Sequence, residues 1–204
     1  MQIHLESERM LLRRFTEADI ADLAALHGDP RVMRYISRPD PRAVVEDETL
    51  PRILDEYRTL PPGLGQWAAL EKETRAFLGW FSLRPATSRG LEGGTELGYR
   101  LRPEAWGRGY ATEGARAVVR NGFEAAGVDR VVATTMTVNT ASRRVLERTG
   151  LTLVRTFFED WPDYIEGAEH GDVEYALTRD EYFRIAHPTS SRWKGTPPTI
   201  MGNR

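Results

Sequence analysis

The sequence of 204 residues contains no cysteine and only four histidines. The absence of cysteine excludes disulfides, thiolate metal sites and a covalent cysteine nucleophile, and it is typical of a protein from a reducing compartment such as the cytoplasm. The histidines are scattered along the chain without the spacing of a metal site, so we expect no bound metal. They are His4, His27, His170 and His187.

Long apolar runs and an excess of basic charge are also missing. The apolar segments fall far short of a membrane span, and the first residues lack the apolar core of a signal peptide. Lys and Arg number 28 against 30 Asp and Glu, which gives a net charge of -2. General binding to nucleic acid needs a basic field. We therefore expect a cytoplasmic protein that binds neither a membrane nor nucleic acid.

The sequence does contain a regular succession of amphipathic segments. A capping-box pattern opens a helix at Thr16, and Pro51 should kink or split another. The predicted strands cover 9–15, 66–71, 75–83, 96–101, 131–138, 151–158 and 171–177, and the predicted helices cover 16–26, 29–36, 41–60, 108–126, 139–149 and 178–186. This order predicts a mixed α/β domain over residues 1–186. Residues 187–204 are rich in Pro, Ser, Thr and Gly and lack acidic residues, so we predict a flexible tail.

A glycine-spaced turn, WGRGYA at 106–111, joins the strand at 96–101 to the long helix that follows. Glycine inside a regular element costs about 1 kcal/mol relative to alanine, so spaced glycines indicate a backbone that must approach another group closely. The free amides at the start of a helix, together with the helix dipole, favour an anion. The simpler alternative is a turn that only packs the helix onto the strand.

Motif spacing separates three kinds of phosphate-binding loop. The P-loop pattern is absent, and the dinucleotide fingerprint fails because Thr112 stands at its third glycine. The third pattern, R/Q-x-x-G-x-G/A, is the pyrophosphate loop of acyl-CoA-dependent N-acetyltransferases. Gly109, Tyr110 and Ala111 fit its second half, and Trp106 stands at the Arg/Gln position.

The segments ELGYRLRPEAWGRGYATEGARAVVRNGFE and VVATTMTVNTASRRVLERTGLTLVRTF give this loop its context. Together they resemble the GNAT superfamily of N-acetyltransferases, and within it the branch of the ribosomal-protein alanine N-acetyltransferases (RimJ/RimL-like), over about residues 5–185. The resemblance implies a single α+β domain of GNAT type, with a central mixed, mostly antiparallel twisted sheet flanked by helices. It also implies direct transfer of an acetyl group from acetyl-CoA to a primary amine, such as a protein N-terminus, in a ternary complex.

The resemblance also assigns the cofactor contacts. Loop amides would bind the pyrophosphate, with a charge-assisted contact from Arg108. The strand at 98–102 would bind the pantetheine arm and splay from the next strand, and an amide near Leu101 would polarise the thioester carbonyl. Asn139 would contact the CoA arm, although a helix N-cap explains it equally well. The implied cofactor residues are Leu101, Arg102, Gly107, Arg108, Gly109, Tyr110, Ala111 and Asn139.

Two catalytic residues follow from the same resemblance. Many relatives carry a tyrosine acid where this chain has Leu146, and the proposed substitute in the branch is a serine at the position of Ser142. A first-turn helix hydroxyl without a further role is the alternative. Glu96 stands where relatives often carry a carboxylate base, and its alternative is an ion pair with Arg100 or Arg116.

Seven acidic residues and no Lys or Arg fall between Phe158 and Tyr175, with aromatic residues interleaved. A charge run is usually a solvated loop, but Asp160 and Asp163 are also candidates for attracting a cationic amine. Two other functions stay open: an acetyltransferase of a small amine or antibiotic, and a CoA-binding sensor without catalysis. A homodimer is compatible with the resemblance, although no sequence pattern argues for one.

Overall fold

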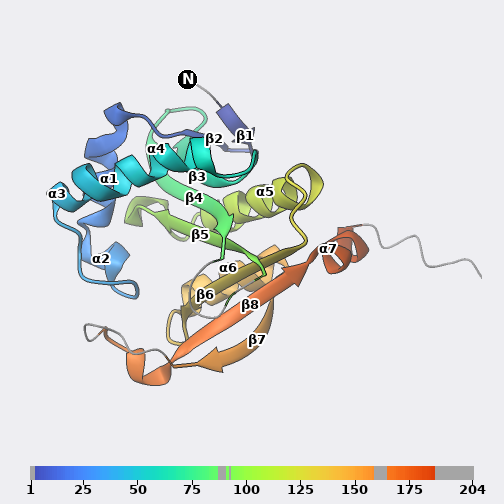
Figure 1. Ribbon diagram of the computed structural model, residues 1–204. Coiled ribbons are helices and arrows are strands. Elements are labelled where there is room, and N and C mark those ends of the chain that lie inside the picture. Colours follow the sequence, from blue (N-terminus) through green and yellow to red (C-terminus); the bar gives the residue numbers. More distant parts are fainter. Residues whose placement is uncertain (1–2, 87–90, 92, 159–164, 187–204) are drawn as a thin grey trace, which may run out of the picture.

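A computed structural model describes residues 3–86, 91, 93–158 and 165–186 of the chain (Figure 1). The strands are β1 (Ile3–Glu6), β2 (Met10–Arg14), β3 (Gly65–Glu71), β4 (Phe77–Pro85), β5 (Thr95–Leu101), β6 (Arg130–Met136), β7 (Thr152–Phe157) and β8 (Asp172–Thr178). The α-helices are α1 (Ile20–His27), α2 (Pro30–Met33), α3 (Arg42–Val44), α4 (Leu50–Thr59), α5 (Tyr110–Glu124), α6 (Thr140–Thr149) and α7 (Arg179–Ala186). Every described helix is too short or too polar to cross a bilayer.

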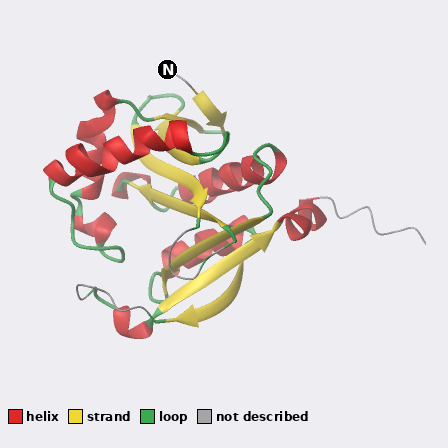
Figure 2. Cartoon of the chain, in the orientation of Figure 1, coloured by secondary structure: helices red, strands yellow, loops and turns green. Residues whose placement is uncertain are grey.

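The strands form one eight-stranded sheet in the order β1-β2-β3-β4-β5-β6-β8-β7. All neighbours are antiparallel except β5 and β6, which are parallel. Helices cover both faces of the sheet (Figure 2). The predicted fold class, a mixed and mostly antiparallel sheet flanked by helices, is confirmed.

The two faces of the sheet carry separate cores. Phe81 points to the face covered by α5, where Gly114 lets the helix approach so closely that a Cβ there would lie 2.2 Å from the Phe81 ring. Trp80 points to the opposite face, where it packs with Leu23 of α1 and Ile53 of α4. Side chains of β4 therefore alternate between the two cores. Trp67, Trp80 and Phe81 are all buried as core residues.

The local signals in the sequence worked as expected at the N-terminal helices. Thr16 and Asp19 form the capping box ahead of α1. Pro51 lies in the first turn of α4, and the turn before it, Val45–Thr49, is a π-helix. Because proline cannot donate the normal backbone bond, the predicted break takes the form of this wider turn. The sequence analysis missed β1, a short edge strand whose first and last residues are exposed.

Candidate active site

The parallel pair β5–β6 opens toward its C-terminal end. The two strands are in register only at Thr95–Val131 and Glu96–Val132, and Figure 1 shows them diverging beyond that point. Both strands extend beyond these two pairs, to Leu101 in β5 and Met136 in β6, but they are no longer paired there. Residues 97–101 of β5 therefore face a gap in the sheet. This is the splay that the family resemblance implied for the strand ahead of the glycine turn.

Backbone alternation determines which amides face this gap. The amide of Arg102 donates to the carbonyl of Leu78 in β4 over 2.8 Å. Neighbouring residues of a strand present their amides to opposite sides, so the Leu101 amide faces β6 and the gap. The Leu101 carbonyl accepts a 2.9 Å hydrogen bond from the Trp106 indole. The Leu101 amide is thus free to face a ligand in the gap, whereas the Arg102 amide, also predicted to contact the cofactor, already donates to Leu78.

The glycine turn leads directly into the first turn of α5. Gly107 and Gly109 have φ values of +71° and +85°, which other residues adopt only with strain, and Gly109 is the N-cap. The first helical bond runs from the Glu113 amide to the Gly109 carbonyl. Within the described chain no hydrogen bond uses the amides of residues 107–112. These amides can therefore receive an anion, as an acetyl-CoA diphosphate would require.

Two guanidinium groups flank the tyrosine that begins α5. Arg9 lies 4.4 Å and Arg108 5.1 Å from the centre of the Tyr110 ring. Glu113 accepts 2.7 Å hydrogen bonds from the Ser7 hydroxyl and from the backbone amide and guanidinium of Arg9. These bonds lower the pKa of the Glu113 carboxyl against the effect of burial. Sequence reasoning could not identify Arg9, because this residue reaches the loop from the β1–β2 turn, about one hundred residues away in the chain.

Ser142 meets a tyrosine that sequence reasoning did not identify. The Tyr99 hydroxyl lies 2.9 Å from Ser142 Oγ and donates to the Ser142 carbonyl over 3.2 Å. Burial raises the pKa of Tyr99 to about 12, so the group is protonated at neutral pH. The expected N-cap is present as well, since Asn139 accepts from the Ser142 amide over 3.2 Å. Two hydroxyl groups therefore meet between β5 and α6, on the stretch of β5 that faces the gap.

Glu96 lies at the closed end of the β5–β6 pair, opposite Arg84. Neither predicted ion pair forms: Arg116 donates to the Arg148 carbonyl instead, and no ion pair to Glu96 occurs in the described part of the chain. Glu96 precedes Leu101 by five residues, which is roughly 17 Å at about 3.3 Å per residue. The structure therefore does not bring these two predicted residues together.

The acidic segment is not uniformly negative. Asp160 and Asp163 lie outside the described residues. Glu166 pairs with Arg34 at 2.7 Å, and the buried Glu174 pairs with Arg130 at 3.0 Å and with Arg155 at 2.7 Å. These arginines come from other parts of the chain, and the run between Phe158 and Tyr175 is therefore partly neutralised.

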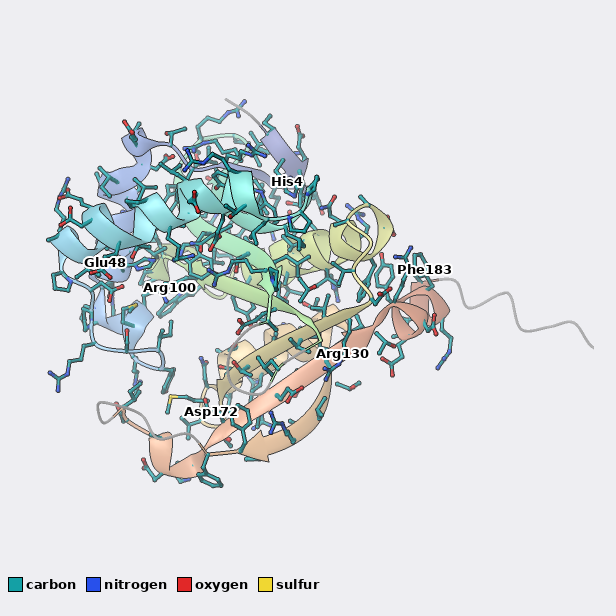
Figure 3. All side chains as sticks on the ribbon, in the orientation of Figure 1. His4, Glu48, Arg100, Arg130, Asp172 and Phe183 are labelled. Atoms are coloured by element: carbon teal, nitrogen blue, oxygen red, sulfur yellow. The ribbon has the colours of Figure 1, made fainter. Side chains whose placement is uncertain are left out.

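A further polar cluster lies on the face of β5 that α5 does not cover. It joins His27 at the end of α1, Asp40, Trp80 and Arg100, the last of which is marked in Figure 3. Trp80 Nε1 can only donate, so its 3.4 Å contact indicates an unprotonated His27 Nε2, and His27 Nδ1 then donates to Asp40 over 2.9 Å. Burial, aided by Arg100, lowers the pKa of His27 to about 4.

Known proteins with similar sequences include acetyltransferases. The family model described as an acetyltransferase (GNAT) domain matches residues 9–152. A protein of Aspergillus fumigatus named FsC-acetyl coenzyme A-N(2)-transacetylase is 39% identical over 182 residues, which cover 82% of this chain and 74% of the relative.

Solved structures share the fold at lower identity. The spermidine N-acetyltransferase of Vibrio cholerae, solved with CoA and spermine, aligns with a TM-score of 0.70 at 14% identity, covering 86% of this chain and 98% of that one. RimL, a ribosomal α-N-protein acetyltransferase solved with coenzyme A, aligns with a TM-score of 0.70 at 19% identity, covering 88% and 99%. Both likenesses concern the fold alone.

Proposed function

This chain belongs to the GNAT acetyltransferases, and on that premise we propose that it moves the acetyl group of acetyl-CoA directly to a primary amine while both substrates are bound. The observation that carries the proposal is the pairing of the bare amides at 107–112 with the gap beside Leu101. One feature suits a diphosphate and the other suits the thioester arm that extends from it. Each is required for a transfer without an acyl-enzyme.

The cofactor side of the proposal depends mainly on backbone groups. The amides from Gly107 to Ala111 would receive the diphosphate, with Arg108 adding charge. The Leu101 amide would donate to the thioester oxygen as negative charge develops there. Its orientation is supported by the Trp106 indole, which holds the carbonyl of the same residue. Asn139 would keep its N-cap role and offer its remaining amide protons to the CoA arm.

The leaving thiolate needs a hydrogen-bond donor. We assign this task to Ser142, with Tyr99 as its partner, because the two hydroxyls lie 2.9 Å apart beside the gap. A tyrosine with a raised pKa keeps its single proton at neutral pH. When Tyr99 donates this proton to Ser142 Oγ instead of to the Ser142 carbonyl, the serine hydroxyl is free to donate to the sulfur. This pair would replace the tyrosine acid that the chain lacks at Leu146.

The attacking amine must lose a proton before its nitrogen can bond to the acetyl carbon. Glu96 remains our candidate for the base, acting through ordered water because of its distance from Leu101 along the strand. The absence of an ion pair to Glu96 within the described residues is compatible with this role. Asp160 and Asp163 stay candidates for attracting the protonated amine.

We consider two candidate acceptors for the acetyl group. A protein N-terminus is the first candidate, because the sequence resembles the RimJ/RimL branch. A small-molecule amine is the second, and it is favoured by the 39% identical relative, whose name specifies transfer from acetyl coenzyme A to an N(2) position. Both candidates are primary amines, and the same site chemistry serves either.

The direct test measures CoA release from acetyl-CoA in the presence of peptides with free N-termini, amino-acid derivatives and polyamines, beside a calorimetric titration with CoA. We expect CoA binding and transfer to at least one amine. The Glu96→Gln variant should bind CoA normally and lose the rising limb of the pH–rate profile, because the base that titrates there is gone. Tight binding without turnover on any amine would contradict transferase activity and favour a sensor; an unchanged profile would exclude Glu96.

A further inference from the structure

Arg100 carries a positive charge that the described residues do not neutralise. Its Nε and Nη1 atoms are out of contact with solvent and have no hydrogen-bond partner. The guanidinium lies over the Trp80 indole, with its carbon 5.3 Å from the ring centre. Burial lowers the pKa of Arg100 to about 10, with a smaller contribution from Arg84, so the group is still charged at neutral pH.

The acid beside Arg100 is already engaged. Asp40 makes its hydrogen bond to His27, 2.9 Å away, and acts on Arg100 only through its field. The His27 imidazole does not neutralise the charge of Arg100, because its lowered pKa leaves it uncharged. Arg84, on the neighbouring strand, has Glu56 at 3.2 Å. Arg100 is thus the arginine on this face whose guanidinium lacks an ion pair in the described chain.

Arg100 is partly exposed as a residue, but its Nε and Nη1 atoms are shielded from solvent. Shielding these two donors is costly, because they lose water without gaining a partner. A shielded donor without a partner needs an explanation, and one explanation is a ligand that supplies the missing acceptor. The face on which Arg100 lies is relevant here. The first turn of α5 and the Tyr99–Ser142 pair lie on the other face, so a cofactor held there leaves the face of Arg100 to the second substrate. Arg100 is also the immediate neighbour of Leu101 in β5.

We propose that Arg100 binds a carboxylate or carbonyl oxygen of the acceptor, and therefore that the acceptor is an amine with an oxygen function close to its nitrogen, as in an α-amino acyl unit. This inference depends on the proposed acetyl transfer and specifies its substrate class. Polyamines, which carry only cationic nitrogen, would meet a like charge at this position and bind poorly. An arginine can donate two parallel bonds to such an oxygen group, which also orients the nearby amine.

The test compares three acceptors of matched size: an α-amino acid, its amide, and the alkylamine that lacks the carbonyl group, with spermidine as a fourth. In the wild-type enzyme we expect kcat/KM at least 10-fold higher for the first two than for the alkylamine. A higher value for the amino acid than for its amide identifies a carboxylate ligand, and equal values identify a carbonyl ligand. In Arg100→Met this preference should fall 10-fold or more because kcat/KM falls for the amino acid and its amide, whereas the alkylamine, which no longer meets a like charge, loses nothing and the KM for acetyl-CoA stays the same.

Thermal unfolding separates recognition from a structural role. Arg100→Met removes an unpaired charge, so its Tm should equal or exceed that of the wild type. The matched control is Arg84→Met, which breaks an ion pair on the same face and should lower Tm without changing the order of acceptors. A uniform loss on every acceptor, no preference in the wild type, or a lowered Tm in Arg100→Met would each overturn the inference. A wild-type enzyme that acetylates no amine would instead refute the proposed function.

Discussion

The two faces of β5 offer different chemical groups to a ligand. On the face of α5, the groups available to a cofactor are mostly backbone amides, exposed by a glycine turn and by the divergence of β6. On the opposite face the polar groups are side chains from separate elements, namely His27, Asp40, Trp80 and Arg100. Within a family the cofactor is constant and the acceptors vary. A site made of backbone amides suits a constant cofactor, because it does not depend on side-chain identity. A site made of side chains suits a variable acceptor, because substitutions can change it.

The largest expected effect concerns the backbone site. Gly109→Val should weaken CoA binding at least 100-fold, because the side chain crowds the bare amides and lies within 3.4 Å of the Arg9 guanidinium from its Cβ alone. The positive φ adds a stability cost of about 1–2 kcal/mol. Isothermal titration with CoA measures the first effect and thermal unfolding the second.

Gly127→Val is the matched control for this variant. Gly127 has a φ of +70° and open space around its Cβ, beyond the far end of α5. It should show a similar loss of stability with normal CoA affinity. Equal CoA affinity in the two variants would remove the distinction between a backbone site and a merely strained turn.

An intermediate effect is expected on the side-chain face, and it concerns stability. His27 has a pKa of about 4 in the folded protein, below the ordinary 6.5. The unfolded chain therefore binds more protons between these values, and the stabilisation is complete above pH 6.5 and lost as the pH falls toward 4. Between pH 7 and pH 5 the wild type should lose about 2 kcal/mol more free energy of unfolding than His27→Gln.

Urea unfolding at the two pH values measures this difference. The pKa of His4 is also lowered by burial, but His4 is present in both proteins and cancels in the comparison. The same pH dependence in His27→Gln and the wild type would show that the His27 imidazole is solvated and is not buried in the polar cluster with Trp80 and Asp40.

The smallest effect is expected at the contact between the strand and α6. Tyr99→Phe should lower kcat about 10-fold with little change in the KM for acetyl-CoA, because Ser142 keeps its position but loses its donor partner. Ser142→Ala should lower kcat by a similar or larger factor. The double variant should be no worse than Ser142→Ala alone, since the two hydroxyls act as a unit. Additive losses in stopped-flow measurements of transfer would show that they act separately.

Much of the fold could be predicted because its signals are local. The capping box at Thr16, the break at Pro51 and the glycine that ends α6 each depend on a few neighbouring residues. The position of the glycine turn between β5 and α5 was found in the same way. The edge strand β1 was missed because its four residues carry no strong alternation, and its pairing with β2 decides its conformation.

The candidate site was less accessible to sequence reasoning, because its contacts are distant in the chain. Tyr99 meets Ser142 across 43 residues, and Arg9 meets Glu113 across 104. Glu96 has the residue type of a base, but only the strand pairing shows that it lies at the closed end of the gap. Arg100 was predicted only as a partner for Glu96. Its Nε and Nη1 donors lack partners because of where Trp80 and Asp40 lie, which only the fold determines.

Trp106 lies in the glycine turn, and its half-exposed indole donates a hydrogen bond to the Leu101 carbonyl. The two other described tryptophans, Trp67 and Trp80, are buried. A ligand that settles on the neighbouring turn would cover the indole of Trp106 and change its emission spectrum. Trp106 is thus an intrinsic fluorophore beside the proposed cofactor site, and binding at this site can be followed by tryptophan fluorescence without a label.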